Sequence, residues 1–193
     1  ANMPLMRANL TRIKDEGASV IKVLLQKRNH LISLESAGFY VDAEQEPWSR
    51  HYRMHSFVLE ELPSRLCSAL PLDVQRLGLS GHSMGGHGAL VLGLRHPDRY
   101  RSVSAVAPIS HPSQCPWGQK AFGYFFGTTP EAQLRWRQWD AVALLEDGYH
   151  REDQLLVDLG SADPFLQEQL RPDDLSLAAA NHHQRLALFI HEG

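Results

Sequence analysis

The stretch VQRLGLSGHSMGGHGALVLGL, residues 74–94, decides the fold of this chain. Its apolar start, 74–79, predicts a short strand, and the small and apolar residues over 89–94 predict a packed helix. Between them lies a G-x-S-x-G pattern centred on Ser83, which in a strand–turn–helix setting presents a serine hydroxyl above the end of a sheet. The pattern is short enough to occur by chance, so the interpretation depends on the flanking strand and helix.

The rest of the chain alternates between strand and helix signals. Short apolar runs at 102–109, 155–159 and 186–190 each predict a strand, and the segments between them are long enough for a helix. Apolar positions recur at helical spacing over 56–70, whereas 37–54, rich in glycine and aromatic residues, is typical of a loop. Strands that alternate with helices form parallel sheets, so we expect an α/β fold with helices on both faces of a mostly parallel sheet.

Length, charge and cysteine content restrict the class of protein. A chain of 193 residues has room for one compact domain, and a net charge of -3 argues against a nucleic-acid partner. No apolar run approaches the roughly 20 residues that span a bilayer, and the charged N-terminus lacks the core of a signal peptide. We therefore expect no membrane partner and a cytoplasmic location. Cys67 and Cys115 are too few for a disulfide scaffold or a thiolate zinc site.

Ser83 is the candidate nucleophile of this chain. A serine hydroxyl attacks a carbonyl only when a base removes its proton and when donors already stand where the oxyanion will form. In a turn of this kind the backbone N–H after the serine is one such donor, which assigns that role to Met84. The pattern is therefore typical of acyl transfer through a covalent serine intermediate.

An acid and then a histidine should follow such a serine along the chain. Asp163, in the loop after the third predicted strand, is the candidate acid, and Asp158, within that strand, is its competitor. His182 and His183 precede the last predicted strand and should lie at the opposite edge of the sheet, whereas His191 lies at the correct end but close to the end of the sequence. We expect the catalytic base to lie outside this sequence, with His191 as the alternative.

Several other residues have a simpler interpretation as parts of the structure. His51 and His55 are four residues apart, as metal ligands on a helix can be, but no third ligand is near them, so we expect no metal site. His82 and His87 flank the serine turn, where a neighbour of the nucleophile points elsewhere, and both are interpreted as structural. Cys115 is expected to be a buried thiol.

Three segments carry a resemblance to a known family: 80–90 (SGHSMGGHGAL), 107–122 (APISHPSQCPWGQKAF) and 37–54. They resemble the S-formylglutathione hydrolase family, also called esterase D. The resemblance implies an α/β-hydrolase fold and hydrolysis of the formate thioester of glutathione, a step of formaldehyde detoxification, with no cofactor and no metal. It places Asp163 where the family has its triad acid.

The sequence also departs from the family pattern. In the family the segment that ends like residues 191–193 runs on into YDHSYYF, which holds the triad histidine, and residues 1–36 match no part of the family that we recognise. We therefore expect 37–193 to be a partial α/β-hydrolase domain, incomplete at both ends, that is a poor hydrolase and self-associates, for example as a homodimer. A general carboxylesterase, an acyltransferase and a non-catalytic member of the family are the alternatives.

Overall fold

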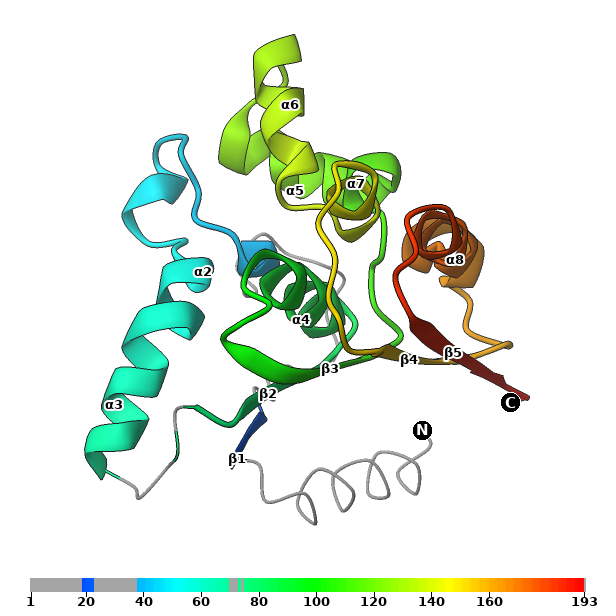
Figure 1. Cartoon of the computed structure of the whole chain (residues 1–193). Helices are drawn as coiled ribbons and strands as arrows, with labels where there is room; N and C mark the ends of the chain where they lie inside the picture. The colour runs from blue at the N-terminus through cyan, green and yellow to red at the C-terminus, as the bar shows by residue number, and fades with distance from the viewer. Residues whose placement is uncertain (1–18, 23–37, 70–72, 74, 193) are drawn as a thin grey trace.

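One parallel sheet organises the part of the chain that the structure describes. The structure is a computed structural model that describes residues 19–22, 38–69, 73 and 75–192. Its sheet has the strand order β1-β2-β3-β4-β5, and every neighbouring pair is parallel (Figure 1). The strands are β1 (Ser19–Lys22), β2 (Leu77–His82), β3 (Tyr100–Val106), β4 (Leu155–Gly160) and β5 (Leu186–His191). The carboxyl ends of all these strands therefore lie along one edge.

The helices confirm the α/β prediction. Helices α4 (Met84–Arg95), α7 (Ala141–Glu146) and α8 (Pro172–Asn181) lie on one side of the sheet (Figure 1). Helix α4 packs on β2 and β3, α7 packs on α4 and α8, and α8 reaches β5. Helices over the second face stay a prediction, as does the division of the chain at residue 37. Apart from β1, the segment 1–36 lies outside the described residues.

The predicted strands are shifted by a few residues where a turn intervenes. Strand β2 begins at Leu77 rather than at residue 74, because the Asp73 carboxylate accepts a hydrogen bond from the Gln75 N–H at 2.9 Å and forms a turn before the strand. Strand β3 ends at Val106 rather than at residue 109, because Ala107 has a φ of 43°, outside the range of a strand.

Segment 37–69 contains more regular structure than its sequence predicts. The expected loop holds the short 3-10 turns η1 (Gly38–Tyr40) and η2 (Trp48–Arg50). The expected helix runs from 54 to 69 as α2 (Met54–Ser56), the π-helical turn η3 (Phe57–Glu61) and α3 (Leu62–Ala69). Pro63 explains the π turn, because it has no N–H to donate to the Leu59 carbonyl. That carbonyl accepts a hydrogen bond from the Arg99 guanidinium instead.

The remaining helical segments, apart from η5, begin at prolines. They are η4 (Pro112–Gln114), α5 (Pro116–Phe126), α6 (Pro130–Arg137) and η5 (Leu166–Leu170). The Thr129 hydroxyl accepts from the Ala132 N–H and caps α6, while the Asp140 carboxylate accepts from two N–H groups in the first turn of α7. None of the helices in the described ranges combines the length and apolar character that crossing a bilayer requires.

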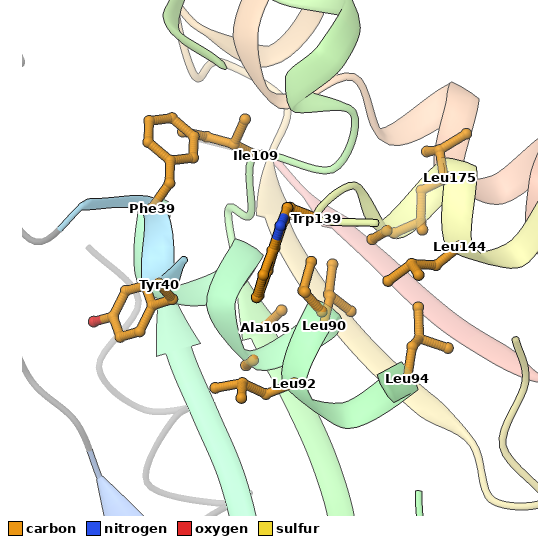
Figure 2. Packing of buried hydrophobic residues seen from close by; sticks show 14 of the residues in the cluster. Phe39, Tyr40, Leu90, Leu92, Leu94, Ala105, Ile109, Trp139, Leu144 and Leu175 are labelled. Atoms are coloured by element: carbon orange, nitrogen blue, oxygen red, sulfur yellow. The ribbon is translucent and has the colours of Figure 1, made fainter. Parts of the chain in front are cut away.

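The core lies between the sheet and the helices on its described face. Figure 2 shows Leu90 and Leu94 of α4 in this core together with Leu144 of α7 and Leu175 of α8. Trp139, just before α7, is 8% exposed and belongs to the same cluster. These contacts join helices far apart in the sequence and fix α4, which follows the serine turn, against the sheet.

A pair of histidines joins the segment before α3 to the end of α4. The His55 Nε2 lies 3.1 Å from the His96 Nε2, and the edge of Trp139 meets the His55 ring at a centroid distance of 4.9 Å. Burial lowers the pKa of His55 to about 4; Asp42 opposes this shift, whereas Arg95 and His96 add to it. Both rings can share one hydrogen bond only while at least one of them is neutral.

Acidification should weaken the fold through His55. Its folded-state pKa lies below the ordinary value of about 6.5, so the unfolded chain binds the proton first and stability is lost as the pH falls from about 6.5 toward about 4. The loss in unfolding free energy between about pH 7 and about pH 4.5 should be smaller in His55→Asn than in the wild type by roughly 1 to 2 kcal/mol. Chemical denaturation at both pH values measures it. The exposed control His150→Asn should behave like the wild type, and equal losses in wild type and His55→Asn would contradict the account.

Close packing of α4 on β3 gives a second prediction. A Cβ at Gly93 would lie 2.4 Å from the Val103 Cγ2, so Gly93→Ala forces the helix off the strand. We expect it to lower the unfolding free energy by roughly 1 to 3 kcal/mol. Gly123→Ala in α5 is the matched control, because its Cβ would meet only the Thr128 methyl, at 3.3 Å, and it should stay within about 1 kcal/mol of wild type. Thermal and urea unfolding measure both; a Gly93→Ala protein as stable as the wild type would refute the packing argument.

Candidate active site

Ser83 occupies the sharp turn between β2 and α4. Its φ of 56° and ψ of -119° are strained for a residue with a side chain. Two backbone hydrogen bonds hold the turn: the Ser83 N–H donates to the Val106 carbonyl at 2.8 Å, and the Ser83 carbonyl accepts from the His87 N–H at 3.0 Å. The strand, turn and helix predicted from the sequence are therefore confirmed, and α4 begins directly at the turn rather than at residue 89.

Two glycines around the serine turn, one in the motif and one directly after it, lie where the backbone passes too close for a side chain. A Cβ at Gly81 would lie 2.0 Å from the Gly85 carbonyl oxygen, and one at Gly86 would lie 3.0 Å from the Pro108 Cα. The first contact closes the turn on itself, and the second brings α4 against the segment that follows β3. Only glycine at both positions permits the strained conformation of Ser83.

Met84 supplies the first N–H of α4. The first N–H groups of a helix have no partner within the helix, and the helix dipole makes its N-terminus favourable for negative charge. The Met84 side chain is half-buried against the core. Its N–H can therefore stabilise an oxyanion that forms beside Ser83, the role expected from the sequence. Within the described ranges the Ser83 hydroxyl itself makes no hydrogen bond.

Asp163 lies in the turn after β4, at the same edge of the sheet as Ser83. One oxygen of its carboxylate accepts a hydrogen bond from the Phe165 N–H at 2.8 Å, and its own N–H donates to the Gly160 carbonyl at 3.2 Å. The side chain is half-buried, so a second partner can still approach it. The described residues pair Asp163 with no histidine.

Asp158, the competing carboxylate, does have a histidine partner. Its Oδ2 lies 3.2 Å from the His191 Nε2, at the ends of the neighbouring strands β4 and β5. Asp158 is 8% exposed, and its backbone carbonyl accepts from the Ala107 N–H at 2.7 Å. His191 therefore lies at the carboxyl edge as expected. His182 and His183, which follow α8 and precede β5, lie at the opposite edge, also as expected.

The segment after β3 forms another part of the site's surroundings, and sequence reasoning missed how it is held. The His111 Nδ1 lies 2.7 Å from the Asp174 carboxylate in the first turn of α8, and its Nε2 lies 3.9 Å from Asp140. Burial raises the pKa of the Asp140 carboxyl, and His111 opposes that shift. The capping position of Asp140 before α7 could have been found from the sequence. The pairing with His111 could not, because it joins separate helices.

Aromatic rings lie between the acid turn and α5. The rings of Trp117 and Phe165 are 4.7 Å apart between centroids, and the Trp117 N–H donates to the buried Gln169 side chain at 3.1 Å. Phe165 is still 43% exposed. The two rings therefore offer an accessible apolar surface next to Asp163.

Two of the residues interpreted as structural, His87 and Cys115, are buried. His87 is fully buried, and burial lowers its pKa to about 4. Cys115 is also fully buried, and burial raises the pKa of its thiol to about 11, so it is a buried thiol. His82, by contrast, is exposed beside the serine. His55 faces His96 across the interior, and the described part of the chain holds no group of three side chains suited to a metal ion.

Comparisons with known proteins agree with this geometry. The family model Esterase, described as "Putative esterase", matches residues 6–192. The S-formylglutathione hydrolase of Rattus norvegicus is 44% identical over 158 residues, which are 81% of this chain and 55% of the rat protein. That of Paracoccus denitrificans (strain Pd 1222) is 46% identical over 151 residues, 78% of this chain and 52% of the relative. The chain thus spans about half the length of the curated relatives it matches.

A solved structure is similar over the same part of the chain. An S-formylglutathione hydrolase from Agrobacterium tumefaciens matches with a TM-score of 0.76 and 43% identity, covering 80% of this chain and 55% of that one. The resemblance to S-formylglutathione hydrolases is confirmed by these relatives. Because the family model matches nearly the whole sequence, with the serine turn inside it, the chain belongs to this esterase family.

Proposed function

We propose that this protein is a serine thioesterase that hydrolyses S-formylglutathione to formate and glutathione. The observation that supports it most is the strained serine between β2 and α4, whose hydroxyl follows a buried strand and precedes a free helix N-terminus. The relatives at 43–46% identity, which carry this activity in their names, supply the substrate. The turn supplies the chemistry, since a serine in this setting forms acyl-enzymes.

In the proposed reaction the Ser83 oxygen attacks the formyl carbon and its proton passes to an imidazole. The Met84 N–H donates to the oxyanion of the tetrahedral intermediate. The C–S bond then breaks, and the glutathione sulfur leaves with the proton that the imidazole returns. Water repeats the attack on the formyl-serine ester, which releases formate and restores the serine hydroxyl.

Asp163 is the proposed acid that orients the imidazole. It lies in a turn at the carboxyl edge and keeps one carboxylate oxygen for a partner, whereas the Asp158 carboxylate is already engaged by His191. We propose the histidine of the YDHSYYF segment, known from the family resemblance, as the base. His191 is the alternative, because it too stands at this edge of the sheet. Its pairing with Asp158 rather than with Asp163 argues for a supporting role.

Two further properties stay predictions. A homodimer would cover part of the outer strand β5, where Phe189 and Ile190 are 46% and 49% exposed. Location in the cytoplasm likewise stays a prediction.

Loss of the nucleophile gives the first test. In a protein that includes the segment with the triad histidine, Ser83→Ala should lower kcat for S-formylglutathione by roughly 10⁴-fold or more, because no acyl-enzyme can form, while thermal unfolding stays close to wild type. The control Ser161→Ala removes an exposed hydroxyl near the same edge of the sheet and should keep wild-type kinetics. Steady-state turnover measures both. Substantial turnover by Ser83→Ala would show that another residue is the nucleophile.

A second test separates the two carboxylates. Asp163→Asn should lower kcat by roughly 10² to 10⁴-fold, because an amide cannot stabilise the imidazolium or select its tautomer. Asp158→Asn should reduce kcat far less and act mainly on stability, since it removes the negative charge that faces His191. Kinetics and thermal unfolding of both variants decide between them. The reverse order of kinetic losses would assign the acid to Asp158 and the base to His191.

A further inference from the structure

The turn Gly38–Tyr40 is strained in a way that calls for an explanation. Its three residues have φ values of 58°, 50° and 55°, so two residues with side chains follow a glycine in the left-handed region. Each such residue costs on the order of 1 to 2 kcal/mol relative to ordinary backbone. The turn is also buried, with Phe39 1% and Tyr40 5% exposed. Surrounding groups must therefore hold it.

His87 is the polar side chain that holds the turn. Its Nε2 lies 3.1 Å from the Phe39 carbonyl oxygen, and the Phe39 ring meets the imidazole edge-on at 5.3 Å. A carbonyl only accepts, so the neutral ring carries its proton on Nε2. The Nδ1 then has no hydrogen bond of normal geometry among the described residues, although the Ile109 carbonyl also interacts with the ring. An unpartnered buried nitrogen lowers the stability of the fold, so the hydrogen bond to the Phe39 carbonyl is the polar contact by which the ring stabilises the turn.

The strained turn also packs the Tyr40 ring against the start of α4. A Cβ at Gly88 would lie 2.5 Å from the Tyr40 Cγ, and one at Gly85 would lie 3.5 Å from its hydroxyl oxygen. Figure 2 shows Phe39 and Tyr40 beside α4. The ring therefore lies along the first two turns of the helix; Gly88 makes room for it, and a Cβ at Gly85 would only touch its hydroxyl.

These contacts form a closed circuit around the peptide that carries the Met84 N–H. The Ser83 carbonyl accepts a hydrogen bond from the His87 backbone N–H, and the His87 ring donates one to the Phe39 carbonyl. The next residue, Tyr40, places its hydroxyl beside Gly85, one residue after Met84. A change at any link lets the first turn of α4 shift. A displaced oxyanion donor stabilises the transition state less while leaving substrate contacts elsewhere in place.

We propose that His87 is a positioning residue that fixes the Met84 N–H toward the oxyanion, acting through the Phe39 carbonyl and the Tyr40 ring. The proposal rests on the proposed function. His87 is not a second base, because its Nε2 is occupied and its ring is fully buried. Burial lowers the pKa of this imidazole to about 4, which agrees with a ring that is uncharged at neutral pH.

Two substitutions separate the hydrogen bond from the volume of the ring. His87→Gln keeps an N–H donor within reach of the Phe39 carbonyl, and His87→Phe fills the site without a donor. We expect His87→Phe to lower kcat by roughly 10 to 100-fold with KM within about threefold of wild type, a fraction of the loss for a whole oxyanion donor. His87→Gln should recover most of kcat. Tyr40→Leu, which removes the ring but leaves His87, should lower kcat in the same way, and serves if His87→Phe does not fold.

The experiment measures steady-state kinetics with S-formylglutathione, the rate of Ser83 labelling by a fluorophosphonate, and hydrogen–deuterium exchange of the amides in 83–88. Low kcat with unchanged KM in His87→Phe and rescue in His87→Gln support the proposal. Equal kinetics in both variants, or a loss confined to KM, would overturn it. If the wild type does not hydrolyse S-formylglutathione, the proposed function fails. The labelling rate and the amide exchange then still test whether His87 positions the first turn of α4. Faster exchange in 83–88 for His87→Phe than for His87→Gln then supports positioning, and equal exchange overturns it.

Discussion

The close approach between the first turn of α4 and the segment after β3 is the constraint on which the structure depends. The Ser83 N–H reaches the Val106 carbonyl at 2.8 Å only because Gly86 lets the helix start lie against Pro108. This contact fixes the strained conformation of the serine and directs the N-terminus of α4 toward the carboxyl edge of the sheet. The parallel strand order also brings the carboxyl ends of β4 and β5, with Asp158, Asp163 and His191, to that same edge.

What the sequence could predict follows from local rules. The strand, turn and helix around Ser83 can be predicted because glycines such as Gly81 and Gly86 stand where the backbone passes too close for a side chain. Strands β4 and β5 can be predicted because they are apolar runs bounded by polar residues. The start of β2 was predicted three residues early, because the turn that Asp73 forms with the Gln75 N–H separates residue 74 from the strand. The π turn before Pro63 follows from the missing N–H of that proline, whereas the hydrogen bond that the Leu59 carbonyl receives from Arg99, 40 residues away, has no local signal in the sequence.

The candidate site shows the same division between local and distant information. Ser83, Met84 and Asp163 could be named as candidates from the sequence because their proposed roles depend on chain order around strands. The pairing of Asp158 with His191 could not, since it depends on the register of β4 against β5. His87 was interpreted as structural, and its burial agrees. Its link to the strained Phe39 depends on residues 48 apart, which no local pattern reveals.

Mass-spectrometric mapping of a fluorophosphonate adduct tests the central claim most directly, because the reagent reports which hydroxyl is activated without requiring a particular substrate. The protein, with the YDHSYYF segment that carries the proposed base present, would be treated at neutral pH, digested and compared with a sample denatured before treatment. The account predicts one adduct, on Ser83, in the folded protein and none in the denatured sample. An adduct on a different residue, or the absence of any adduct in the folded protein, would contradict the claim that the strained turn between β2 and α4 presents an active nucleophile.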